Sequence, residues 1–163
     1  MRIASRTLKI ICDVQNIVAI ISLVTMIFLN AIEIFRRYFF GLSWIWIQEI
    51  TVLFLVFFTF FGFSKVVYDK NDIAIDLILS KLPSAGRKIL QLALYIIVLV
   101  FCSVYSFYTY KLVIAQINQT TPVAHYPMMW RSIPPLINGV TMCLIYIKEI
   151  WNTLFSKMED TPC

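Results

Sequence analysis

Four long runs of apolar residues limit what this chain can fold into. They cover roughly residues 14–35, 44–67, 89–110 and 133–155. The third run contains no charged residue at all. Because an apolar stretch of about 20 residues matches the thickness of a bilayer's hydrocarbon core, each run is long enough to cross a membrane as a helix. We therefore expect four membrane-spanning helices and a single membrane domain over residues 1–163.

The composition is that of a membrane protein. The chain is 60% hydrophobic and 14% charged, whereas a soluble domain is about 25% charged and needs that charge to cover its surface. A membrane strand would alternate lipid-facing and lumen-facing residues, but the run Val52–Phe63 does not alternate. The predicted fold class is therefore an all-α integral membrane protein in contact with the lipid bilayer.

The basic residues are distributed unevenly between the two sides of the predicted membrane domain. Ten fall at the termini, at the cytoplasmic ends of spans or in the second connection: Arg2, Arg6, Lys9, Lys65, Lys70, Lys81, Arg87, Lys88, Lys148 and Lys157. Four fall on the other side: Arg36, Arg37, Lys111 and Arg131. Since the cytoplasmic side carries the excess of Lys and Arg, both termini are predicted to be cytoplasmic. The net charge of +5 thus reflects topology, and no nucleic-acid partner is expected because there is no long basic block.

The second connection, residues 68–88, has a helical pattern of its own. Asp72, Asp76 and Ser80 recur at a spacing of four residues, and Pro83 blocks further helix. This pattern predicts a short amphipathic helix on the membrane surface. The alternation in DIAID also allows a short strand, although a lone strand would have no sheet to join.

The third connection, residues 112–132, is the longest segment on the outward side. It is rich in Pro, polar and aromatic residues, so we expect it to be partly irregular. The third helix can continue to about Asn118, and Pro134 and Pro135 suit the first turn of the last helix, where a missing N–H costs nothing. His125, the single histidine, is interpreted as a solvated loop side chain.

The sequence contains no recognisable catalytic or metal-binding cluster. Acidic and basic residues in the spans lie towards their ends: Glu33, Glu49, Lys65, Lys148 and Glu149. Intramembrane charges usually mark ion or proton pathways, so this chain is poorly equipped to move a solute alone. One histidine and four cysteines without paired spacing provide no haem, zinc or disulfide pattern. We expect no enzyme activity, cofactor or metal.

Arginines and a carboxylate meet where the first span leads to the second. Glu49 follows the predicted start of the second helix, where the helix dipole favours negative charge. Arg37, or alternatively Arg36, is expected to pair with it across the short turn. The alternative is that the arginines snorkel and Glu49 is solvated independently. The tryptophans suit the headgroup level as interface anchors: Trp44, Trp46, Trp130 and Trp151.

The order of several short motifs resembles a known family. Arg37-Tyr38, Trp46-x-x-Glu49, Gly62, Asp76 and Leu82-Pro83 are similar to the pattern of the small membrane subunit, DctQ type, of tripartite ATP-independent periplasmic (TRAP) transporters. The motifs cover about residues 37–83, and the four-span layout extends the resemblance over nearly the whole chain.

The resemblance implies a subunit of the bacterial inner membrane that has two partners. A large membrane subunit would carry the sodium and substrate sites, and a periplasmic substrate-binding protein would deliver an organic acid. The small subunit would scaffold the large one and help to dock the binding protein. The alternatives are a self-contained multidrug-type transporter, which needs an acid well inside its first helix, and a small membrane enzyme or electron carrier.

Overall fold

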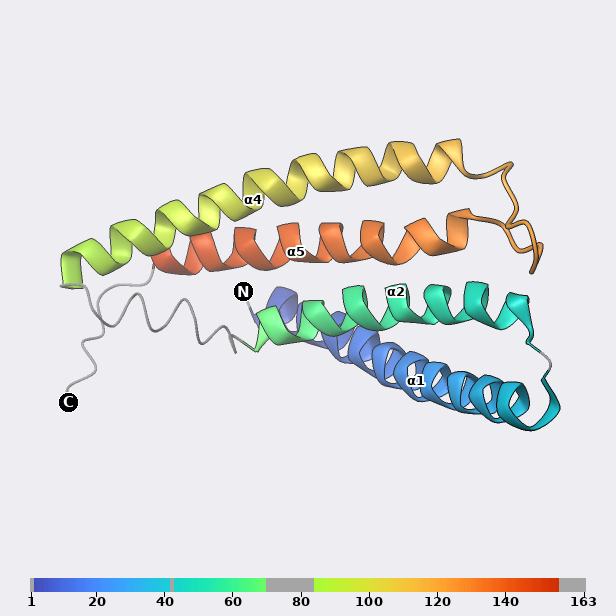
Figure 1. The fold of residues 1–163 in the computed structure, drawn as a ribbon. Helices are drawn as coiled ribbons and strands as arrows, with labels where there is room; N and C mark the ends of the chain where they lie inside the picture. Colours follow the sequence, from blue (N-terminus) through green and yellow to red (C-terminus); the bar gives the residue numbers. More distant parts are fainter. Residues whose placement is uncertain (1, 42, 70–83, 156–163) are drawn as a thin grey trace.

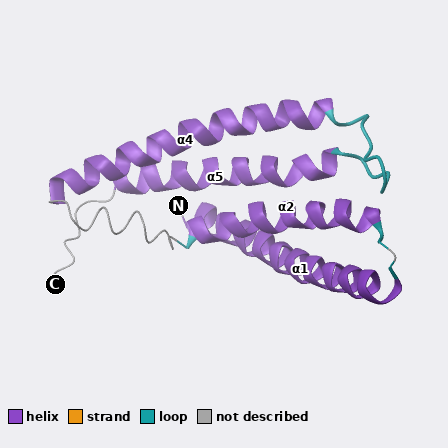
Figure 2. Cartoon of the chain, in the orientation of Figure 1, coloured by secondary structure: helices purple, strands orange, loops and turns teal. Residues whose placement is uncertain are grey.

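The chain forms four long helices in the residues that the structure, a computed structural model, describes: 2–41, 43–69 and 84–155. These helices are α1 (Arg2–Phe40), α2 (Ile45–Tyr68), α4 (Ser84–Ala115) and α5 (Met129–Phe155). Each contains a segment that is long and apolar enough to cross a membrane. No strand is present in these ranges, and only helices and short loops are drawn in Figure 2. The predicted all-α membrane fold is confirmed.

The four helices lie side by side in an open row (Figure 1). α1 and α2 form one antiparallel hairpin, α4 and α5 form another, and α2 packs against α5 to join them. The order in space is therefore α1, α2, α5, α4. In the described part of the chain α4 packs against α5 alone. The outer helices of the row consequently have most of their surface free of contacts within the chain.

Three helices, α1, α4 and α5, are longer than the apolar runs that predict them, and α1 exceeds its run most. α1 begins at Arg2 rather than near Val14, because the polar residues before Val14 interrupt the apolar run without breaking the helix. Its apolar segment, Arg6–Phe40, has 35 residues, although about 20 suffice to span the hydrocarbon core. α1 must therefore tilt or extend beyond that core at one end.

The start of α5 differs from the expected position. The helix begins at Met129, so Pro134 and Pro135 lie inside it instead of in its first turn. The first turn is closed earlier, by hydrogen bonds from the Trp130 and Arg131 amides to the carbonyls of Pro127 and Met128. The predicted surface helix with Asp72, Asp76 and Pro83 lies outside the described residues.

Polar side chains join the two hairpins across the middle of the row. The Gln15 amide donates to Thr141 Oγ1 at 2.9 Å, which links α1 to α5. Ser64 Oγ donates to Asn138 Oδ1 at 2.6 Å, which links α2 to α5. Such bonds between membrane helices contribute about 0.6 kcal/mol each on average. They fix which helix faces meet, which apolar packing alone does not specify.

The α4–α5 hairpin depends on one glycine. A Cβ added to Gly139 would overlap Ser106 Oγ and would lie 3.1 Å from the nearest atom of the Tyr105 ring. The absence of a side chain therefore lets α5 approach α4 closely. Gly62 on α2 differs, because its added Cβ would meet only the Ala19 Cβ at an ordinary 3.8 Å.

Candidate functional site

One end of the row carries the α1–α2 turn and the α4–α5 loop (residues 116–128), and both lie beyond the helix ends (Figure 1). The α1–α2 turn reverses the chain through Gly41, whose φ is +64°. An L-residue with a side chain rarely adopts this left-handed conformation, whereas glycine does so without steric cost. The turn thereby returns α2 directly along α1.

Glu33 of α1 caps the start of α2. Its carboxylate accepts a hydrogen bond from Ser43 Oγ at 2.8 Å and from the Trp44 amide at 3.2 Å. A helix start has amide groups without intrahelical partners and a partial positive charge, so a carboxylate there is stabilising. The sequence favours Glu49 as the carboxylate at this helix start, but the residue that caps it is Glu33.

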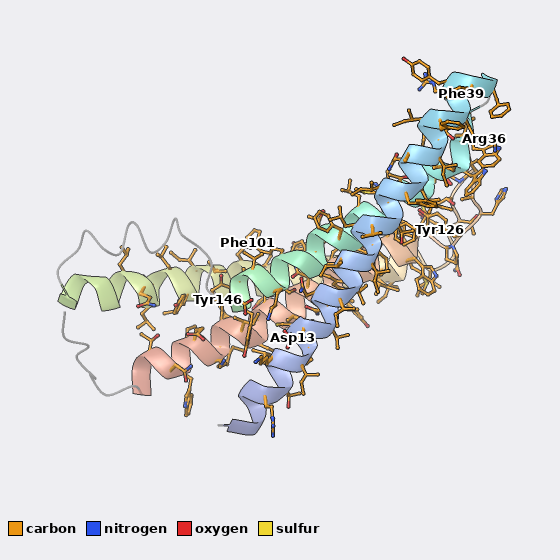
Figure 3. The ribbon with its side chains drawn as sticks, turned by 90° about the horizontal axis from the view of Figure 1, so that it is seen from below. Asp13, Arg36, Phe39, Phe101, Tyr126 and Tyr146 are labelled. Carbon is orange, nitrogen blue, oxygen red and sulfur yellow. The ribbon has the colours of Figure 1, made fainter. Side chains whose placement is uncertain are left out.

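The tip of the α1–α2 turn is aromatic and cationic. The Arg36 guanidinium carbon lies 3.1 Å from the centroid of a Trp44 ring, which is cation–π geometry. Tyr38 and Phe39, near the end of α1, are largely uncovered: their exposed fractions are 87% and 71%. Arg36 and Phe39 are labelled at this tip in Figure 3. The tip therefore presents large side chains that the chain itself does not cover.

Glu49 fastens the α4–α5 loop to α2. Its carboxylate accepts hydrogen bonds from the backbone amides of Val123 at 3.3 Å and Ala124 at 2.8 Å. The Tyr126 hydroxyl donates to the Glu49 carbonyl oxygen at 3.2 Å. A tyrosine hydroxyl is protonated at neutral pH and can donate, and burial raises the pKa of Tyr126 further. Three hydrogen bonds thus connect α2 to a loop that also joins α4 to α5.

The α4–α5 loop also has internal structure. The Thr121 amide donates to the Tyr126 carbonyl at 3.0 Å, and the Met128 amide donates to the Gln119 carbonyl at 2.8 Å. An isolated antiparallel bridge joins Thr120 and Pro127. At the bend between these bonds His125 has φ of +53°, a left-handed conformation in which His is one of the more frequent non-glycine residues. The loop is therefore a short, folded hairpin.

The expected ion pair between Glu49 and an arginine is not formed in this structure. The carboxylate binds the two loop amides, and no described arginine lies within ion-pair distance of it. Arg36 instead stacks on Trp44, while Arg37 lines an open cavity with Ile34 and Tyr38. The turn does bring the ends of α1 and α2 together as expected. The two arginines and Glu49 nevertheless have separate surroundings and do not meet.

The four tryptophans lie at helix ends. Trp44 and Trp46 form a tilted ring pair with centroids 5.5 Å apart at the start of α2. Trp130 and Trp151 lie near the two ends of α5, and half of each is exposed. One anchor near each end of a spanning helix suits two headgroup layers. Their anchoring in the headgroup region stays a prediction.

The other end of the row has its own ion pairs. Lys65 Nζ lies 2.7 Å from Asp13 Oδ1 on α1 and 3.2 Å from Asp69 Oδ1 just after α2. The Lys148 ammonium lies 5.1 Å from the Tyr68 ring centroid. The Lys65–Asp13 pair links α2 to α1, and the Lys148–Tyr68 contact links α5 to the end of α2. In the part of the chain that the structure describes, no cluster of His, Cys, Asp and Glu could hold a metal ion.

A comparison with known proteins assigns the family. The family model for the DctQ component of tripartite ATP-independent periplasmic transporters matches residues 23–156. The chain belongs to this family. A Haemophilus influenzae protein named as a candidate TRAP transporter small permease is 24% identical over 145 residues, which cover 89% of this chain and 82% of that protein. The resemblance inferred from the motifs is thereby confirmed.

Membership of the DctQ family makes this chain a component of a TRAP transporter. Of the motif residues, Arg37, Trp46 and Glu49 lie together at the end with the α1–α2 turn. Gly62 lies further along α2, where it faces Ala19 of α1. The α4–α5 loop, whose Val123 and Ala124 amides bind Glu49, is a partner that the sequence does not predict.

Proposed function

We propose that this DctQ-family protein is the small, non-catalytic membrane subunit of a TRAP secondary transporter that imports an organic acid across a bacterial inner membrane. It scaffolds a large membrane subunit and helps to dock a periplasmic substrate-binding protein. The large subunit carries the sodium and substrate sites. This assignment is consistent with the spans themselves, because the middle of each described span has no Asp, Glu, Lys or Arg.

The open row of helices is the observation that supports scaffolding most directly. Only 11% of the apolar window of α1 and 6% of that of α4 is buried within the chain. Large side chains such as Phe28, Ile97 and Phe101 are each more than half exposed. A membrane helix that makes so few contacts with the other helices of its own chain can pack against helices of another subunit. A large subunit packed along the row would supply them, and lipid would cover the remainder.

In the proposed orientation both termini are cytoplasmic, and the α1–α2 turn and α4–α5 loop face the periplasm. The support is the excess of basic residues at the termini and in the second connection. Cysteine labelling in intact cells, after replacement of the native cysteines, tests this orientation. A cysteine at Gln119 should react with an impermeant reagent, and a cysteine at Lys157 should not. The reverse pattern would refute the orientation.

The self-contained multidrug-type transporter is disfavoured by the position of Glu33. Such a transporter needs an acid inside its first helix, but Glu33 lies near the end of α1 and is engaged by Ser43 and the Trp44 amide. Reconstitution into proteoliposomes tests the choice. The chain, the large membrane protein from its gene cluster and the soluble binding protein should together take up the ligand that co-purifies with that binding protein. Equal uptake by this chain alone would contradict the proposal.

A further inference from the structure

The end that carries the α1–α2 turn and the α4–α5 loop has cations without carboxylate partners. Both of its acids, Glu33 and Glu49, direct their oxygens at backbone amides or a hydroxyl. Among the described residues, Arg37, Lys111 and Arg131 are exposed and make no ion pair. The Lys111 ammonium lies 4.6 Å from the centroid of the Phe107 ring on α4. Lys111 lies in the last turns of α4 and Arg131 in the first turn of α5. The two therefore flank the α4–α5 loop.

We propose that the α4–α5 loop, held in shape by Glu49, is a preformed docking surface for an acidic face of a soluble protein, with Lys111 and Arg131 supplying the complementary charge. This inference rests on the proposed function, because the soluble protein is the substrate-binding protein. Glu49 is a positioning residue here. It acts through the loop and does not touch the partner.

The loop is suited to docking because its shape is already fixed. Two internal hydrogen bonds close the hairpin, and three bonds attach it to α2. A loop ordered before binding loses less conformational entropy on association than a disordered one. Val123 and His125 are exposed in this loop, so it presents uncharged side chains between Lys111 and Arg131 in the chain.

The position of the loop favours a soluble protein over lipid headgroups as its occupant. The loop extends past the ends of α4 and α5 (Figure 1), so it is at the end of the spanning helices and not on their lipid-facing sides. It also folds back over the start of α2 through Glu49 and Tyr126; Tyr126 is labelled in Figure 3. Residues 116–128 lie between the candidate spans Leu90–Ala115 and Met129–Thr153, on the side from which a soluble protein would approach.

The first arm of the test measures the order of the loop. The complex of this chain with its large subunit is placed in lipid nanodiscs, and amide hydrogen exchange is followed over residues 116–128. Glu49→Gln removes the negative charge and one acceptor oxygen, so we expect exchange in the loop to accelerate about tenfold. Glu33→Gln is the matched control, because Glu33 binds Ser43 and Trp44 and should leave this exchange unchanged.

The second arm measures binding of the purified substrate-binding protein to the same nanodiscs. Glu49→Gln should weaken binding about tenfold, mainly through faster dissociation. Tyr126→Phe removes only the hydrogen bond to the Glu49 carbonyl and should act in the same direction with a smaller effect. Arg131→Glu should slow association about tenfold and make it less sensitive to salt, because opposite charges steer encounter.

The outcomes separate the inference from the proposed function. Faster exchange with unchanged binding would show that the loop is not the docking surface, and unchanged exchange would show that Glu49 does not hold the loop. Either result overturns the inference and leaves the family assignment intact. If the complex bound anionic lipid vesicles as strongly as it binds the substrate-binding protein, lipid headgroups would be the occupant of the surface. That result would also overturn the inference. Failure of the unmodified complex to bind the soluble protein would instead refute the docking part of the proposed function.

Discussion

The Glu49 carboxylate accepts a hydrogen bond from the backbone amide of Ala124 at 2.8 Å, which joins two residues 75 positions apart in the chain. The bond links α2 to the α4–α5 loop and therefore ties the first helical hairpin to the second at one end of the row. At the middle of the row, Ser64 and Asn138 provide a second link between α2 and α5. These few polar contacts connect the two hairpins of an otherwise open arrangement.

The first prediction concerns the coupling of Glu49. Glu49→Gln should lower the stability of the purified complex by about 1.5–3 kcal/mol, because hydrogen bonds to a charged group are lost. In a double-mutant cycle, its effect should not add to that of Tyr126→Phe, since both changes release the same loop. Its effect and that of Arg37→Ala should add within about 0.5 kcal/mol, because these residues do not touch.

Thermal unfolding of the four proteins of each cycle provides the measurement. A coupling energy of about 1 kcal/mol or more between Glu49 and Arg37 would support the ion pair expected from the sequence and contradict the geometry described above. Arg36→Ala is a useful comparison, because its loss removes the stacking on Trp44 without affecting the loop.

The second prediction concerns the cap of α2. Glu33→Gln should destabilise the α1–α2 hairpin by about 1 kcal/mol, the typical cost of losing a carboxylate cap at a helix start. Ser43→Ala should cost less, because the carboxylate keeps the Trp44 amide as a partner. The unfolding temperatures of the two variants provide the comparison. A larger loss for Ser43→Ala than for Glu33→Gln would show that the cap is not centred on Glu33.

The third prediction uses a matched pair of glycines. Gly139→Ala should destabilise the protein by about 1–3 kcal/mol, because its methyl group would overlap Ser106 Oγ and crowd the Tyr105 ring. Gly62→Ala should have little effect, since the added methyl group meets only Ala19 at 3.8 Å. The fraction of each variant that stays monodisperse after mild heating in detergent provides the readout. Equal sensitivity at both positions would contradict the close approach of α4 and α5 at Gly139.

The fourth prediction concerns the bend of the α4–α5 loop. His125 adopts a left-handed conformation, which costs roughly 1–2 kcal/mol for an L-residue and nothing for glycine. His125→Gly should therefore preserve slow hydrogen exchange in the loop. His125→Val should accelerate it, because a β-branched residue is disfavoured at such a φ. Identical exchange in the two variants would mean that the backbone conformation at this position does not govern the loop.

Much of the fold could be predicted from the sequence, because a helix that crosses the hydrocarbon core of a bilayer needs about 20 consecutive apolar residues. Four apolar runs predict four spans, and the order of short motifs predicts the family. The start of α1 was missed because Arg6, Lys9 and Asp13 interrupt the apolar run, although they do not break a helix. The open row was not predictable, because helix faces in a membrane are matched by small and polar residues such as Gly139 and Asn138, whose partners cannot be read from spacing.

The candidate site shows the same limit at the level of single residues. The sequence singles out Glu49 near the start of the second helix, whereas the carboxylate that caps α2 is Glu33. The partners of Glu49 are backbone amides of Val123 and Ala124, and every residue except proline has such an amide. Contacts of this kind leave no signal in residue type. The one sequence hint was the Pro-rich, acid-free composition of the loop itself.

The central claim is that this chain works as one subunit of a larger membrane complex, and co-purification tests it most directly. A tagged chain is expressed with the large membrane protein from its gene cluster, extracted in mild detergent and analysed by native mass spectrometry. The account predicts a stable assembly of the two proteins, which persists when Glu49→Gln loosens the α4–α5 loop. Recovery of this chain only as a monomer or homodimer that transports by itself would contradict the account.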